Sequence, residues 1–176
     1  MNPITLTPAT TPADIADVRA LCWAYRDFLG SVADVSAAVT SGFHPDAKYK
    51  ALMAQLPDLH ARPTGLIVLA RDADGTPVGC GMSHPLSPDT SEIKRVFVTP
   101  AARGARVAQQ LCEMLVAQAQ RDGFSRVVLD THRALHAAQR LYRRMGFAQR
   151  GPYQPLPDAV LPELVFFEKS LKPKSP

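Results

Sequence analysis

The sequence has few of the features that mark membrane, secreted or metal-binding proteins. Its longest apolar runs, such as residues 66–70, are far shorter than the roughly 20 residues of a membrane-spanning helix. The N-terminus has no basic region followed by an apolar stretch, so no signal peptide is expected. The three cysteines form no CxxC or Cys/His ligand pattern. We therefore expect a cytoplasmic protein without a metal or a membrane partner.

Aromatic residues are scarce, at 7%, and the basic part of the chain has no aromatic motif typical of RNA binding. That part is residues 94–150, where eleven Lys and Arg stand against Glu113, Asp122 and Asp130, a balance of +8 in a chain of net charge +4. Such a segment is either the solvated face of two helices or a site for a polyphosphorylated cofactor or a nucleic acid. Without a helix-turn-helix or zinc-finger pattern, nucleic acid is the least favoured partner.

Length and composition predict one domain. A chain of 176 residues with 46% apolar content can bury one full hydrophobic core. We place this domain at residues 1–171 and expect the tail KPKSP, residues 172–176, to be disordered. No internal repeat is apparent.

Apolar periodicity predicts a long first helix, with Thr11 as N-cap and Pro12 at the first helical position. A second long helix is expected to end at Gly123. The helices are expected at residues 12–30, 103–122 and 135–145, with weaker patterns at residues 32–39 and 46–56 that either cover a binding cleft or only pack on the surface.

Alternation and turn residues predict the strands. A first strand ends at Pro8, two strands flank the turn at residues 72–75, and residues 126–130 form a short apolar strand. Further strands are expected at residues 92–98, from Phe147 onward and at residues 164–171. The resulting fold class is α/β of mixed α+β type: a central twisted, mostly antiparallel sheet flanked by helices, with one parallel step across the helix after residue 103.

Two segments resemble one family. RVFVTPAARGARVAQQL carries a basic, glycine-containing loop at a helix start, and AAQRLYRRMGFAQRGPY places a tyrosine before Gly-Phe. Together they resemble the GNAT superfamily of acyl-CoA N-acyltransferases, most closely a group of small bacterial acetyltransferases whose substrates are mostly unassigned. Arg106 stands where the family usually has a central glycine, and Leu135 stands where many relatives have Asn.

The resemblance implies a binding site for acetyl-CoA as cosubstrate. A loop at a helix start suits a pyrophosphate, because the first backbone N–H groups of a helix lack intrahelical partners. The preceding strand end would offer backbone groups to the pantetheine arm and polarise the thioester carbonyl. The implied cofactor-binding residues are Val96, Phe97, Val98, Arg103, Gly104, Ala105, Arg106, Val107 and Ala108.

Catalytic residues follow from the same resemblance. Tyr142 is the candidate acid that protonates the departing thiolate, although a tyrosine at this helical spacing can also be core packing. Glu92 is the candidate base, because strand alternation puts it on the face of Lys94 and Val96; a salt bridge is the alternative interpretation. His84 and His132 are further candidate bases.

The sequence also suggests acceptor contacts. Tyr25 and Tyr153 are candidates to line an acceptor pocket. The leading hypothesis is an N-acetyltransferase that acts on the primary amine of a small molecule by direct transfer in a ternary complex. Alternatives are a protein or peptide N-acetyltransferase and a non-catalytic acyl-CoA-binding module. A homodimer is left open.

Overall fold

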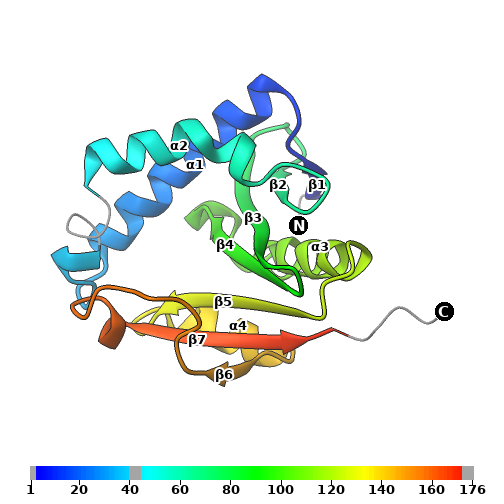
Figure 1. The fold of residues 1–176 in the computed structure, drawn as a ribbon. Coiled ribbons are helices and arrows are strands. Elements are labelled where there is room, and N and C mark those ends of the chain that lie inside the picture. Colours follow the sequence, from blue (N-terminus) through cyan, green and yellow to red (C-terminus); the bar gives the residue numbers. More distant parts are fainter. Residues whose placement is uncertain (1–2, 40–44, 172–176) are drawn as a thin grey trace.

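A computed structural model describes residues 3–39 and 45–171. Its strands form one sheet in the order β1-β2-β3-β4-β5-β7-β6 (Figure 1). In the described part of the chain β4 and β5 run parallel, and all other neighbours pair antiparallel. The strands are β1 (Thr5–Pro8), β2 (Leu66–Arg71), β3 (Pro77–Ser87), β4 (Thr90–Val98), β5 (Arg126–His132), β6 (Ala148–Arg150) and β7 (Leu164–Ser170).

Helices pack on both faces of the sheet. The parallel step from β4 to β5 crosses over through the third long helix, which confirms the predicted topology. The helices are α1 (Pro12–Ser31), α2 (Asp46–Leu59), α3 (Val107–Arg121) and α4 (His136–Arg144), with 3-10 turns η2 (Pro100–Ala102) and η3 (Leu161–Glu163).

The sheet separates two apolar cores. On β2, Leu66 and Val68 face the core that α3 covers, whereas Ile67 and Leu69 face the core covered by α1 and α2. Figure 1 shows α1 and α2 running together over β3 and β4. A strand buried on both faces needs apolar residues at every position. The continuous apolar runs in β2 and β5 follow from this double burial.

The first helix begins where its sequence signals place it. The Thr11 side chain accepts from the Asp14 N–H, and the Asp14 carboxylate accepts from the Thr11 N–H, forming a capping box. Pro12 occupies the first turn, where its missing N–H costs no hydrogen bond.

Three predicted boundaries were wrong. The helix expected at residues 32–39 is a bend with turns at residues 32–36, and only residues 37–39 of it are helical. α2 continues through Pro57 to Leu59 instead of ending at residue 56. α3 begins at Val107 rather than at residue 103, because residues 103–106 form the turn before it. The predicted disordered tail, residues 172–176, lies outside the described residues.

A β-bulge interrupts the alternation of β4. Cys80 pairs with Phe97 and Met82 with Lys94, so one residue of β3 lies opposite two of β4. Arg95 occupies the bulge with φ 52°. Strict alternation predicted that Lys94 and Val96 share a face of the sheet, and this prediction was wrong. Val96 packs toward α3, whereas Lys94 lies on the opposite face and contacts Glu92 there.

Neither a membrane span nor a metal cluster is found in the described chain. None of its helices is long and apolar enough to cross a bilayer. Across residues 3–39 and 45–171, no group of three His, Cys, Asp or Glu side chains is arranged to hold a metal ion.

Candidate active site

Strands β4 and β5 part at the centre of the molecule. Their backbone pairing joins Thr90 to Arg126 and ends at the pair Glu92–Val128. Beyond this point a cleft of about 680 Å³ opens, lined by the end of β4, the start of α3, the end of β5 and one face of α4. This volume is within the usual range of small-molecule sites.

The turn before α3 presents backbone N–H groups to the cleft. Gly104 has φ 90° and nothing lies within 4 Å of where its Cβ would stand. Arg106, the N-cap of α3, is also left-handed, with φ 57°, and no side chain caps the helix. The first N–H groups of α3, at Val107 and Ala108, therefore lack intrahelical partners beside the cleft, where the helix dipole adds partial positive charge.

Arg106 adopts the conformation that a glycine would adopt more easily. A left-handed backbone costs a residue with a Cβ about 1–2 kcal/mol. The exposed Arg106 side chain lines the cleft, as does Arg103, whose guanidinium carbon lies 4.7 Å from the centre of the Phe28 ring.

Eight of the nine predicted cofactor-binding residues line this cleft. Ala105 does not: it packs against the core that α3 covers. The eight are Val96, Phe97, Val98, Arg103, Gly104, Arg106, Val107 and Ala108.

Tyr142 projects from α4 into the same cleft. Its ring packs on Phe147 and Phe167, with centroids 6.0 and 5.7 Å away, and its side chain is buried. Burial raises the pKa of Tyr142 well above its ordinary value. Its hydroxyl has no hydrogen-bond partner among the described residues, so an O–H is available to a group in the cleft.

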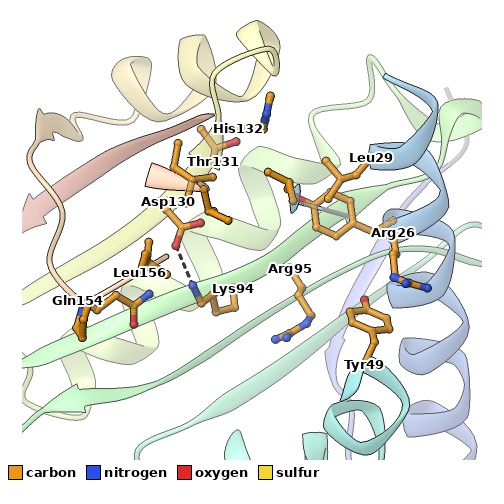
Figure 2. A pocket seen from close by; sticks show the side chains of 15 residues that line it. Arg26, Leu29, Tyr49, Lys94, Arg95, Asp130, Thr131, His132, Gln154 and Leu156 are labelled. Carbon is orange, nitrogen blue, oxygen red and sulfur yellow. Dashed lines mark hydrogen bonds and ion pairs between the residues drawn. The ribbon is translucent and has the colours of Figure 1, made fainter. Parts of the chain in front are cut away.

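A second cavity of about 390 Å³ adjoins the first (Figure 2). It lies between α1, the ends of β4 and β5, and residues 154–164. The two cavities meet where they share the residues Tyr25, Lys94, Arg95, Asp130 and Thr131. Tyr25, a candidate acceptor contact from the sequence, lines both cavities, and burial raises its pKa.

The Lys94 ammonium holds two carboxylates together beside this junction. Its Nζ lies 2.7 Å from Glu92 Oε1 and 2.8 Å from Asp130 Oδ2. Burial alone would lower the pKa of Lys94, but these two carboxylates outweigh burial and raise it. Two carboxylates against one ammonium give this cluster an excess of negative charge.

Glu92 is enclosed by partners. Oε1 also accepts from the Tyr153 hydroxyl at 2.7 Å and from Gln154, and Oε2 lies 3.0 Å from His84 Nε2. Burial would raise the pKa of Glu92, but the contacts with His84 and Lys94 dominate and lower it to about 2. Glu92 is only 1% exposed and lines neither cavity.

Asp130 has the exposure that Glu92 lacks. It lines both cavities, and its Oδ2 accepts from Lys94 and lies 3.0 Å from the Tyr153 hydroxyl. Its other oxygen, Oδ1, has no hydrogen-bond partner in the described parts of the chain. Tyr153 is half-buried and lines neither cavity, so its hydroxyl contributes by orienting the two carboxylates.

The candidate histidine bases have no free nitrogen facing the junction. His132 lines the smaller cavity, but Nδ1 accepts from the Ala134 N–H and Nε2 lies 2.8 Å from Glu163 Oε2. The Ala134 bond places the proton on Nε2, which donates to Glu163. His84 lines neither cavity.

Sequence reasoning missed Asp130 and Arg95 as site residues. The signal for Asp130 was an acidic residue that directly follows an apolar run, a position that often carries a functional group. Arg95 gave no signal, because the bulge that turns it into the junction comes from pairing with β3.

Comparisons with known proteins agree on one family. The Acetyltransferase (GNAT) family profile matches residues 29–147, more than half of the chain. An uncharacterized N-acetyltransferase of Schizosaccharomyces pombe is 30% identical over 160 residues, 89% of this chain and 91% of that protein. An IAA acetyltransferase of Azospirillum brasilense is 40% identical over 118 residues, 63% of this chain and 71% of that protein.

A solved structure has the same fold over nearly the whole chain. It is a Klebsiella pneumoniae protein provisionally named an acyl-CoA N-acyltransferase, with a TM-score of 0.71 and 29% identity. The match covers 96% of this chain and 98% of that one. The chain belongs to the GNAT family and is an acyl-CoA-dependent acetyltransferase.

Proposed function

We propose that this enzyme transfers an acetyl group from acetyl-CoA to the primary amine of a small molecule, directly within a ternary complex. The observation that carries the proposal is the meeting of two cavities at Asp130, a larger one that reaches a helix N-terminus and a smaller one lined by α1, the strand ends and residues 154–164. The larger cleft suits the pyrophosphate and pantetheine of the cosubstrate. The smaller cavity suits the acceptor.

The residues of the larger cleft fit acetyl-CoA. The N-terminus of α3 and the open space at Gly104 suit a diphosphate, and Arg103 and Arg106 add positive charge. Beyond Glu92 the edge of β4 that faced β5 has no strand partner among the described residues, so its backbone groups are available to the amides of the pantetheine arm. A backbone N–H of this edge would polarise the thioester carbonyl.

Asp130 Oδ1 would hold the acceptor. It accepts a hydrogen bond from the neutral amine, orients the nitrogen lone pair toward the carbonyl carbon, and receives a proton as the C–N bond forms. Lys94 and Glu92 keep the Asp130 carboxylate in place. In this proposal Glu92 is a positioning residue rather than the base suggested by the sequence.

Tyr142 would act on the leaving group. Because burial raises the pKa of Tyr142, its hydroxyl carries a proton at neutral pH before the reaction. As the C–S bond breaks, the hydroxyl donates a hydrogen bond to the departing thiolate and passes its proton to sulfur. The phenolate then takes a proton from solvent and Asp130 releases the amine proton to solvent, so both groups return to their starting states.

Direct transfer is favoured by the positions of the cysteines. Cys22, Cys80 and Cys112 are all buried and line neither cavity, so no thiol is placed to accept the acetyl group. A small acceptor is favoured over a protein or peptide because the acceptor cavity holds only about 390 Å³. The retained Tyr142 hydroxyl argues against a non-catalytic acyl-CoA-binding module.

The test is an acceptor panel with acetyl-CoA. Thiol release that depends on an added amine, with acetylated amine in equal amount by mass spectrometry, is the expected result. Thermal stabilisation by CoA without release on any amine or peptide would favour the binding module. Release with peptides alone would favour the protein acetyltransferase.

A further inference from the structure

Positive charges around the acceptor cavity are mostly neutralised by neighbours. Lys94 lies between Glu92 and Asp130, and the Arg26 guanidinium lies 2.6 Å from Asp46 Oδ1. His132 Nε2 lies 2.8 Å from Glu163 Oε2, and its Nδ1 accepts from the Ala134 N–H. Arg95, by contrast, makes no ion pair with any carboxylate in the described residues.

Arg95 is held at the cavity by the bulge in β4. Its φ of 52° is a conformation that costs a residue with a side chain about 1–2 kcal/mol. Strain of this kind at a cavity wall is a common feature of functional sites. Figure 2 shows the Arg95 side chain in the space between Lys94 and Tyr49. The half-buried guanidinium shares a side-chain hydrogen bond with Tyr49 but has no carboxylate partner among the described residues, so its other N–H groups are suited to bind a carboxylate through two parallel hydrogen bonds.

Asp130 and Arg95 are thus two groups of opposite charge at the junction where this cavity meets the larger cleft. Asp130 Oδ1 is the acceptor for an amine, and Arg95 is the donor for an anion. The apolar part of the wall includes Leu29, Leu156, Val160 and Leu164, and polar side chains such as Tyr49, His132 and Gln154 complete it. An amine without an acidic group would leave the Arg95 charge desolvated and unpaired, which disfavours its binding.

We propose that the acceptor is a small amino acid with an apolar side chain, whose carboxylate is bound by Arg95 while its amine faces Asp130. This inference rests on the proposed acetyl transfer to a small amine and narrows its substrate class. The cavity volume of about 390 Å³ suits an acceptor of this size. The Arg95 contact selects the acceptor and takes no part in bond making.

The test compares three versions of the same acceptor. L-valine, L-leucine, L-methionine and L-phenylalanine are each assayed beside their amides and their decarboxylated amines. With the wild-type enzyme, the best amino acid is expected to exceed its amide in kcat/KM by about 10- to 100-fold, the range for a hydrogen bond to a charged group. In Arg95→Gln this ratio is expected to fall to near one, mainly through KM of the amino acid.

Matched variants keep the test decisive. Arg95→Lys keeps the charge without the forked geometry and is expected to recover part of the preference. Arg26→Gln removes an arginine of the same cavity and is expected to keep the preference. Circular dichroism and the thermal shift on CoA addition report whether each variant is folded and binds the cosubstrate.

Each outcome decides the proposal. Equal kcat/KM for the amino acid and its amide in the wild type would overturn the assignment of Arg95. A preference for the amino acid that persists in Arg95→Gln, or that is lost in Arg26→Gln, would overturn it too. None of these results would contradict small-amine acetylation itself. Acetylation of peptides alone, or of no amine at all while CoA still binds, would overturn the proposed function and this inference with it. Loss of the preference in Arg95→Gln alone supports the proposal.

Discussion

The Lys94 ammonium nitrogen lies 2.8 Å from Asp130 Oδ2, and this contact joins β4 to β5 just beyond their last backbone pair. Each residue stands two positions past that pair, Glu92–Val128, so a side-chain bridge continues the register where the backbone ladder has opened. The bridge fixes the Asp130 carboxylate while leaving Oδ1 toward the cavities. The separation of β4 from β5 therefore also places Asp130, the group proposed to accept the amine hydrogen bond, beside the cavities.

Replacement of Asp130 by Asn tests that placement. The variant keeps the size of the side chain but loses the carboxylate, so kcat/KM for the amine is expected to fall by about 10²-fold or more. CoA affinity should stay the same, because Lys94 retains Glu92 at 2.7 Å. Steady-state kinetics and CoA titration measure the two effects. Full activity in this variant would exclude Asp130 from catalysis.

Replacement of Glu92 by Gln tests its role as a positioning and stabilising group. Glu92 has a folded pKa of about 2, below its ordinary value of 4.5, so the folded state holds its proton less tightly. Its stabilisation is fully present above about pH 4.5 and is lost as the pH falls through 2. The variant is expected to lose about 2–3 kcal/mol of unfolding free energy at pH 7.

Urea unfolding of both proteins at pH 7, 4 and 3 measures this difference. The difference in unfolding free energy between wild type and Glu92→Gln should become smaller as the pH falls. A gap that is constant with pH would show that the Glu92 charge does not stabilise the fold.

Replacement of Tyr142 by Phe tests the thiolate contact. Loss of one hydrogen-bond donor to the developing charge is expected to lower kcat by about 10- to 100-fold. The melting temperature should change little, because the hydroxyl has no partner among the described residues. Since burial raises the pKa of Tyr142, its ionisation should not reduce wild-type activity between pH 8 and 10. Unchanged turnover in the variant would remove Tyr142 from the mechanism.

Replacement of Arg106 by Gly or Val tests the turn before α3. Glycine relieves the left-handed strain of about 1–2 kcal/mol but loses about 0.5–1 kcal/mol to unfolded-chain entropy, so stability should be equal or slightly higher. Val is β-branched and should destabilise the protein by about 1–2 kcal/mol. Denaturant unfolding compares the three proteins. A clear loss of stability in Arg106→Gly would show that its side chain supports the fold.

The sequence predicted most of the architecture because local signals and topology agreed. The cap at Thr11, the apolar run in β5 and the Gly123 stop are local features, and each appears in the structure. The wrong boundaries lie where local signals compete with tertiary contacts. Pro57 reads as a break, yet α2 accommodates it, with Leu56 fully buried.

The junction of the cavities depends on long-range pairing. The bulge at Arg95 follows from the register of β4 on β3, and no single-strand pattern reports it. That bulge separates the face of Lys94 from that of Val96, so alternation could not show which carboxylate reaches the cavities. Glu92 and Asp130 are both acids on adjacent strands. Only their contacts in the folded protein show that Glu92 is enclosed by partners and that Asp130 is open to the cavities.

Acetyl transfer to a small amine at Asp130 is tested most directly by amine-dependent thiol release from acetyl-CoA, with product mass measured in the same samples for wild type and Asp130→Asn. Equal amounts of free CoA and acetylated small amine are expected for the wild type. Asp130→Asn is expected to bind CoA without comparable turnover. Small-amine acetylation at the wild-type rate by Asp130→Asn would contradict the account, as would CoA binding by the wild type with no small amine acetylated.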